Sequence, residues 1–198
     1  MTESLDSVAH ARWLSRGIRF EWITLGWNVV GVAVLGYLAI TASSVALAGF
    51  GLDSFIEIGA SAVVLWELSG TGAARQRRAL RLIGVAFIAL AIYLTAQSVI
   101  ALVVAHHASQ SVAGIVWTAI TALAMFLLAA GKGRAGRALA NPVLTTEGRV
   151  TFIDGLLAVA VLLGLALNFA FGWWWADPIA GFVIGFYAIR EAVHIFRT

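Results

Sequence analysis

The sequence predicts an all-α fold: a polytopic membrane protein whose six transmembrane helices form one bundle. Three observations support this prediction. The chain of 198 residues is 61% hydrophobic and only 12% charged, whereas about 25% charged residues is usual in soluble domains. It contains six apolar stretches, each long enough for the roughly 20 residues that a helix needs to cross the hydrocarbon core. Its basic residues fall on one side of these stretches. We therefore expect a single transmembrane domain over residues 1–198.

The six predicted spans follow a short N-terminal segment, residues 1–18, and run at about 20–42, 45–68, 82–105, 111–131, 143–169 and 174–196. Small residues recur in every span, which suits close packing of helices in lipid. In the last span Gly181 and Gly185 form a G-x-x-x-G pattern, which we interpret as a packing or dimer face. Trp173–Trp175, just before that span, is typical of an anchor at the membrane interface.

The basic residues alternate with the spans. The 13 Lys and Arg residues form four groups: Arg12, Arg16 and Arg19; Arg75, Arg77, Arg78 and Arg81; Lys132, Arg134, Arg137 and Arg149; and Arg190 and Arg197. The other three loops have none. By the positive-inside rule, both termini and the two basic loops are cytoplasmic. The segment from Gly131 to Arg137 is then expected to be a flexible, basic cytoplasmic linker. Because topology explains the charge, the pI of about 10 does not indicate a nucleic-acid partner.

Two acids interrupt the second span. Asp53 and Glu57 are four residues apart, so on a helix their carboxyl groups lie one turn apart on the same face. A carboxylate at the bilayer centre costs about 2.5–3.5 kcal/mol on insertion scales, so the pair needs a cation or protons to offset it. In the alternative, purely structural interpretation, the two acids stay protonated, or they form hydrogen bonds with backbone, Ser or Asn groups of a neighbouring helix. The chain has no cysteine, so thiolate metal ligands are excluded.

The fifth span carries a second acidic face. Glu147 and Asp154 are seven residues apart, with Val150 between them on the same side of the helix. Asp154 lies about nine residues inside this span, at a rise of about 1.5 Å each, and so reaches a depth similar to that of Asp53. Glu147 lies nearer the cytoplasmic end, where it is either a ligand or a surface residue.

On these residues the sequence resembles the transmembrane domain of the cation diffusion facilitator family. The resemblance implies six helices, cytoplasmic termini, and a transport site made of an acid-x-x-x-acid pair on the second helix and a His-x-x-x-Asp pair on the fifth. Asp53 and Glu57 match the first pair and Asp154 matches the last residue of the second. The segment from Trp174 to Ala180 resembles the start of the family's sixth helix.

The chain departs from the family pattern in two places. Val150 stands where the family has its histidine, so the nitrogen ligand is missing, and Glu147 is the nearest replacement. The sequence ends at Thr198, so we expect the family's C-terminal cytoplasmic domain to be absent, as is its His-rich loop between the fourth and fifth helices.

The sequence therefore predicts a divalent cation transporter, not an enzyme, that exports the metal ion in exchange for protons. The predicted metal ligands are Asp53, Asp154, Glu57 and Glu147, in that order. The resemblance implies Zn²⁺, whereas an oxygen-only ligand set favours Mn²⁺ or Mg²⁺, with Fe²⁺ and Co²⁺ between them. We expect no prosthetic group, a homodimer surrounded by lipid, and a location in a bacterial inner membrane or a plasma membrane.

Three alternative functions remain. One is a proton-coupled exporter of organic cations, against which the interfacial position of the Trp residues counts. The second is a non-transporting membrane partner or regulator that keeps the fold, an alternative favoured by the missing histidine at position 150. The third is an intramembrane enzyme, for which the sequence offers no nucleophile–base pair. Metal capture by His106 and His107, in a predicted outer loop, is a weaker hypothesis still.

Overall fold

The computed structural model describes residues 2–42, 44–70, 73–105 and 109–197, and these ranges are almost entirely α-helical. His106 and His107 lie outside the described residues. The six helices are α1 (Thr2–Ala42), α2 (Val45–Leu68), α3 (Ala73–Val104), α4 (Val112–Ala138), α5 (Pro142–Phe171) and α6 (Ala176–Arg197). The fold class is that of the sequence prediction.

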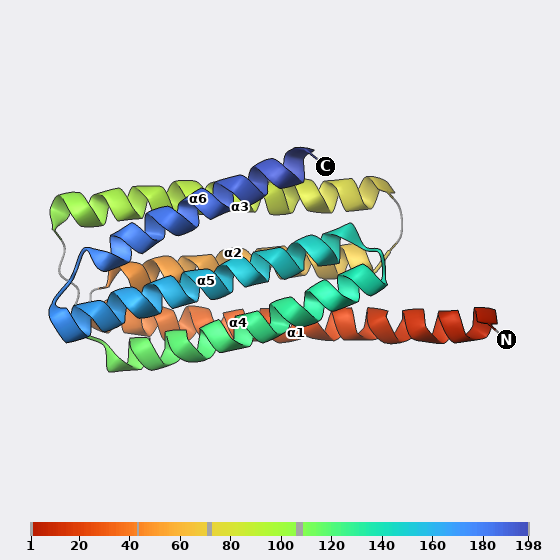
Figure 1. Ribbon diagram of the computed structural model, residues 1–198, viewed down its shortest axis with the longest axis horizontal. Helices are drawn as coiled ribbons and strands as arrows, with labels where there is room; N and C mark the ends of the chain where they lie inside the picture. Colours follow the sequence, from red (N-terminus) through yellow and green to blue (C-terminus); the bar gives the residue numbers. More distant parts are fainter. Residues whose placement is uncertain (1, 43, 71–72, 106–108, 198) are drawn as a thin grey trace.

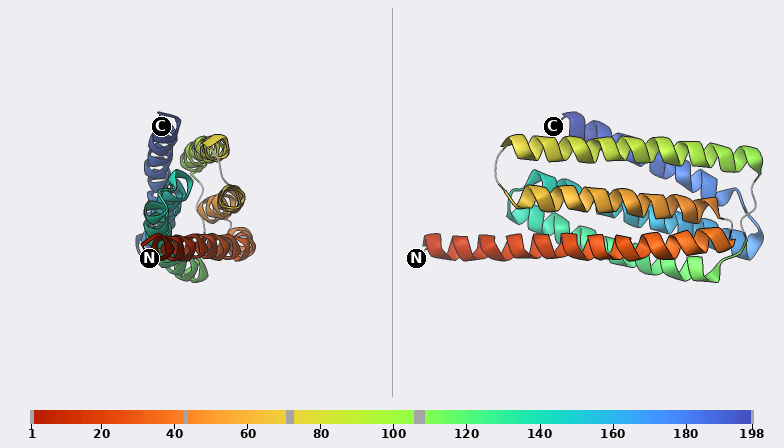
Figure 2. Two further views of the ribbon diagram at one scale, coloured as in Figure 1. Left: turned by 90° about the vertical axis from the view of Figure 1, so that its right-hand side faces the viewer. Right: turned by 180° about the vertical axis from the view of Figure 1, so that it is seen from behind.

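Four of the helices close a ring. Helix α1 packs on α2, α2 on α5, α5 on α4, and α4 on α1, while α3 and α6 pair with each other along one side of this ring. Figures 1 and 2 show the helices running side by side along the long axis of the molecule, with the α3–α6 pair on one side of α2 and α5. Because successive helices alternate in direction, both termini and the α2–α3 and α4–α5 connections lie at the same end (Figure 1).

The surface of the bundle is that of a membrane protein. Within the described residues, α1 to α5 are each long and apolar enough to cross a membrane. Large apolar side chains point outward, such as Ile40 at 81% exposure and Val103 at 78%, whereas Asp53, Glu57 and Asp154 are buried inside. This distribution reverses that of a soluble protein, in which charged residues are mostly exposed. The chain is therefore a multi-pass membrane protein.

The helices extend beyond the predicted spans at the end that carries the termini. Helix α1 begins at Thr2 and α3 at Ala73, and α4 continues to Ala138. The prediction of a flexible linker from Gly131 to Arg137 was therefore wrong. Hydropathy locates only the part of a helix that crosses hydrocarbon, and α4 continues as a helix past that part. The true connection is a tight turn, in which Asn141 caps α5 by accepting a hydrogen bond from the Leu144 N–H at 2.9 Å.

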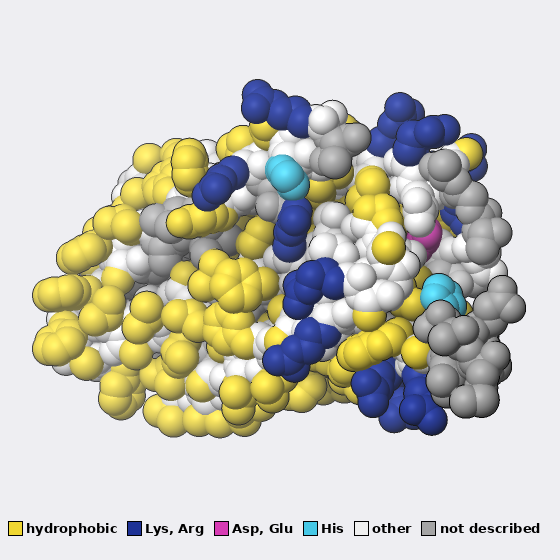
Figure 3. Space-filling view, turned by 45° about the vertical axis from the view of Figure 1, so that its right-hand side comes forward, with side chains coloured by type: hydrophobic (Ala, Val, Ile, Leu, Met, Phe, Trp, Pro, Cys, Tyr) yellow, Lys and Arg dark blue, Asp and Glu magenta, His cyan; other side chains and the backbone are white. Residues whose placement is uncertain are grey.

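The basic side chains gather at one end of the molecule. In Figure 3 they lie toward the end that carries the termini, and the opposite part of the visible face is almost entirely hydrophobic. The basic residues that the sequence places on one side of the predicted spans therefore also lie at one end of the folded molecule.

The G-x-x-x-G pattern of α6 faces α3 of the same chain. A Cβ atom added to Gly181 would collide with the Ser98 hydroxyl, and one added to Gly185 would lie 3.4 Å from Thr95 Oγ1. Of the two interpretations of this pattern, the structure favours packing within the chain over a dimer face.

Candidate metal centre

Three of the four predicted ligands line one small cavity inside the bundle. Asp53 and Glu57 come from α2 and Asp154 comes from α5, where these two helices pack together. Their residues are 3%, 3% and 4% exposed, respectively. Apolar side chains of α3 close the cavity: Ile83, Phe87 and Leu90. The i, i+4 spacing on α2 and the depth of Asp154 on α5 thus place the acids together, as the sequence predicted.

Val150 lines the same cavity, one turn before Asp154. It is 7% exposed and part of the apolar core. The position at which the family pattern has its histidine therefore faces the acids in this chain, although the side chain is aliphatic.

The cavity acids offer oxygen ligands with spare capacity. Asp154 Oδ2 is buried, and no N–H or hydroxyl group of the described residues donates a hydrogen bond to it. Within the described ranges, no three His, Asp or Glu side chains are close enough to form a ready-made metal site. Binding of a metal ion at this cavity therefore requires the acids of α2 and α5 to converge further. Carboxylate oxygens suit hard divalent cations such as Mg²⁺ and Mn²⁺.

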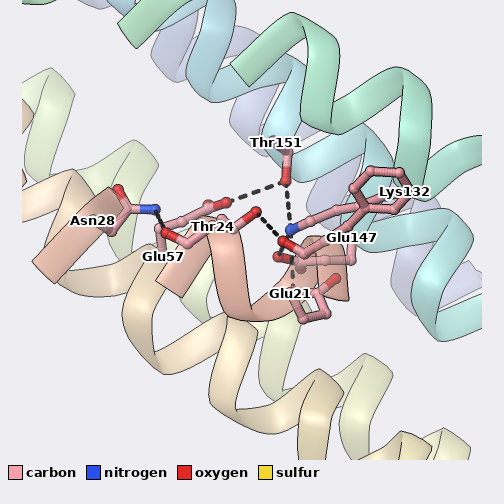
Figure 4. Close-up of polar contacts among 8 residues, drawn as sticks. Glu21, Thr24, Asn28, Glu57, Lys132, Glu147 and Thr151 are labelled. Atoms are coloured by element: carbon pink, nitrogen blue, oxygen red, sulfur yellow. Dashed lines mark hydrogen bonds and ion pairs between the residues drawn. The ribbon is translucent and has the colours of Figure 1, made fainter. Parts of the chain in front are cut away.

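The fourth predicted ligand, Glu147, lies in a separate cluster. Its Oε1 atom is 3.1 Å from Lys132 Nζ, and Glu21 Oε2 is also 3.1 Å from that nitrogen. Lys132 further donates a hydrogen bond to Thr151 Oγ1 at 3.0 Å. Glu21, Lys132, Glu147 and Thr151 are all fully buried, at 0% exposure. Figure 4 shows these side chains, from α1, α4 and α5, converging on the Lys132 ammonium group. We call them the lysine cluster.

One hydrogen bond joins the lysine cluster to the cavity acids. Thr151 donates to Glu57 Oε1 at 3.2 Å while it accepts from Lys132 (Figure 4). Glu57 is therefore the carboxylate shared by the two groups.

The sequence did not indicate that Lys132 and Glu21 belong to a buried charged cluster. Lys132 lies among glycines and arginines, and that composition is typical of a loop. Glu21 begins an apolar run, and that place is typical of the interface. A close approach of α4 and α5 buries Lys132: a Cβ atom added to Gly148 would lie 2.8 Å from the Gly133 backbone nitrogen. The signal in the sequence is that Lys132–Gly133 and Glu147–Gly148 each place a small residue next to a charged one.

Two further polar residues are held near the helix ends or within a helix. Glu67 is 2% exposed and accepts hydrogen bonds from Asn141 Nδ2 at 3.1 and 3.4 Å, so it ties the end of α2 to the start of α5. Asn28 bonds to the Thr24 carbonyl one turn earlier in α1, at 3.0 Å.

Comparison with known proteins agrees with this architecture. The family described as cation efflux transmembrane domain matches residues 81–198. Transmembrane protein 163 of Xenopus laevis is 24% identical over 172 residues, which cover 83% of this chain. The chain spans about 60% of the length of that relative.

Proposed function

Because the chain belongs to the cation efflux family, we propose that it transports a divalent metal cation across the membrane in exchange for protons. The observation that carries the proposal is the cavity between α2 and α5, into which three buried carboxyl groups project at the depth of the membrane. Acids in such a position mark ion pathways by default, since their burial needs a compensating positive charge. Neither of the ion pairs of Lys132 includes Asp53 or Asp154.

In this proposal Asp53, Glu57 and Asp154 are the ligands of the transported ion. Metal binding requires ionised carboxylates and releases the protons that they otherwise hold. A cavity that opens alternately to the two sides then couples the flow of metal ions to an opposite flow of protons.

Two considerations bear on the identity of the ion, and they favour different metals. The family resemblance favours Zn²⁺, whereas three carboxylates with Val150 in place of a nitrogen ligand favour a harder ion, with Mn²⁺ first and Fe²⁺ or Co²⁺ next. The experiment therefore compares Zn²⁺ with Mn²⁺.

The test is ion flux in liposomes that contain the purified protein and a pH-sensitive dye. We expect Zn²⁺ or Mn²⁺ influx to move protons the opposite way, and Asp53→Asn or Asp154→Asn to abolish both flows. Glu67→Gln is a matched control because Glu67 is a buried acid of the same helix but lies outside the cavity, so its flux should stay near that of the wild type.

Two results would overturn this proposal. Normal flux in both Asp variants would place the site elsewhere. Tight ion binding with no flux in the wild type would favour the non-transporting regulator, for which Val150 in place of a histidine is the supporting observation.

We also propose that the end with the termini is cytoplasmic and that the protein acts as a homodimer in a bacterial inner or plasma membrane. In intact cells, Arg77→Cys should resist an impermeant thiol reagent while Trp173→Cys, at the opposite end, reacts with it. The reverse pattern of labelling would invert the orientation. Cross-linking in the native membrane, with this chain as the only labelled species, tests the dimer by the mass of the product.

A further inference from the structure

The interior of the helix bundle contains a positive charge that belongs to the protein itself. Lys132 is the only lysine of the chain, and its side chain is fully buried between two glutamates. Among the described residues it is the only buried basic side chain. A buried charge is tolerated only when it is paired and hydrogen-bonded, and Lys132 has three partners: Glu21, Glu147 and Thr151.

The acids around this ammonium group have more capacity than it uses. Glu21 Oε1 and Glu147 Oε2 are buried, and neither has a hydrogen-bond partner among the described residues. The lysine cluster thus has two carboxylates for one ammonium group, and Glu57 adds a third carboxylate through Thr151. Such a set of acids attracts cations, and the cation now in place is tethered to α4.

We propose that Lys132 competes with the transported ion for the buried carboxylates. Its ammonium group, which is attached to α4, occupies the acid-rich interior, and an ion bound at Glu57 weakens the interactions that hold the ammonium group there. The inference rests on the proposed function, because it concerns the same carboxylates. It adds a residue that controls how tightly they bind a divalent cation.

Two physical links connect the ammonium group to Glu57. The first is charge: each of the two hydrogen bonds through Thr151 is about 3 Å long, so Lys132 Nζ lies within about 6 Å of Glu57 Oε1. A metal ion bound to Glu57 would lie close enough to the ammonium group for the two cations to repel each other strongly in a medium of low polarity. The second is the hydroxyl group of Thr151. Its one proton is donated to Glu57 Oε1, so a metal ion that binds this oxygen draws electron density from it and weakens the hydrogen bond from Thr151.

This linkage works in both directions. If the ammonium group lowers the affinity for a divalent ion, then the ion must weaken the interactions of the ammonium group by the same factor. The ion pairs by which Lys132 joins α1, α4 and α5 are then weaker when an ion occupies the cavity.

The first experiment measures ion affinity by calorimetric titration of the purified protein with Mn²⁺ and Zn²⁺. Lys132→Gln removes the charge and should tighten binding by about tenfold or more. Lys132→Arg keeps the charge in a side chain of different shape, so its affinity should stay closer to that of the wild type than the affinity of Lys132→Gln does. A second bound ion in Lys132→Gln would also support the proposal, because it would occupy the freed Glu21 and Glu147.

The second experiment needs no variant, so it remains decisive if Lys132→Gln fails to fold. Since the chain has one lysine, labelling lysine with ¹⁵N gives a single side-chain signal in the nuclear magnetic resonance spectrum. The chemical shift of this signal should change when Zn²⁺ is added, and the midpoint of that change should match the Zn²⁺ concentration at which calorimetry finds half-maximal binding.

The outcomes separate the two proposals. If the wild type binds and transports an ion but the lysine signal stays fixed, or if Lys132→Gln binds the ion with unchanged affinity, Lys132 is a structural ion pair and the competition is refuted. If the wild type binds neither Zn²⁺ nor Mn²⁺, the proposed function fails and the competition fails with it.

Discussion

The two buried acidic groups of this protein differ in what neutralises them. In the lysine cluster, Glu21 and Glu147 share an ammonium group that α4 supplies. In the cavity, neither ion pair of that group involves Asp53 or Asp154, and Asp154 Oδ2 receives no hydrogen bond within the described part of the chain. The same chemical group at similar burial therefore has two different surroundings. Where the protein supplies the counter-charge, the acid joins helices; where it supplies none, our proposed function assigns the acid to an ion from outside.

The two groups also join different helices. The lysine cluster ties α1, α4 and α5 together, whereas the cavity lies between α2 and α5 and is closed by α3. Glu57 and Thr151 form the contact between the two groups. A movement of α2 relative to α5 would alter the cavity and this contact together.

The largest expected effect comes from breaking the lysine cluster. Lys132→Met leaves two buried carboxylates without a counter-charge, so it should lower the free energy of unfolding by about 3–5 kcal/mol. The triple variant Glu21→Gln, Lys132→Met, Glu147→Gln removes all three charges and should recover most of that loss. Denaturant unfolding in detergent micelles measures both values. If the triple variant were as unstable as the single one, loss of packing would be the cause rather than unpaired charge.

A smaller effect of opposite sign is expected in the cavity. Asp154→Asn replaces an acid that lacks a partner at Oδ2, so the metal-free protein should be as stable as the wild type or more stable, by about 1 kcal/mol. The variant should also lose the stabilisation by ligand, which for the wild type is about 2.7 kcal/mol at an ion concentration of 100 times Kd. Thermal unfolding with and without Zn²⁺ or Mn²⁺ checks both. A marked loss of stability in metal-free Asp154→Asn would mean that this acid, too, is a structural one.

The smallest effect concerns the choice of ion. Val150 faces the cavity acids, so Val150→His adds an imidazole nitrogen beside Asp154. Zn²⁺ gains more from nitrogen than Mn²⁺ does, and the affinity ratio should shift toward Zn²⁺ by about tenfold. Glu147→Gln should leave this ratio unchanged, because Lys132 holds Glu147 outside the cavity. Calorimetric titration of both ions gives the ratio, and an unchanged ratio in Val150→His would mean that the added ring turns away from the ion.

Much of the architecture could be predicted from the sequence because it depends on local properties. A run of apolar residues has to be a helix in lipid, since only a helix satisfies its own backbone hydrogen bonds. The alternation of basic segments gives the direction of each helix. The spacing of Asp53 and Glu57 puts both on one face of α2, and the cost of exposing a carboxyl group to lipid directs that face toward the interior of the bundle. The cavity residues Asp53, Glu57, Val150 and Asp154 follow from these rules together with the family resemblance.

The partners of each charge were decided only by the tertiary structure. Lys132 and Glu147 are fifteen positions apart and Glu21 is more than a hundred positions from both, so no periodicity relates them. They meet because Gly133 and Gly148 let the backbones of α4 and α5 approach closely, and because α1 packs on α4. The sequence determined which segments cross the membrane and which acids enter it. Whether a buried acid is paired with a lysine or packs against residues without a positive charge depends on the packing of helices that are distant in the chain.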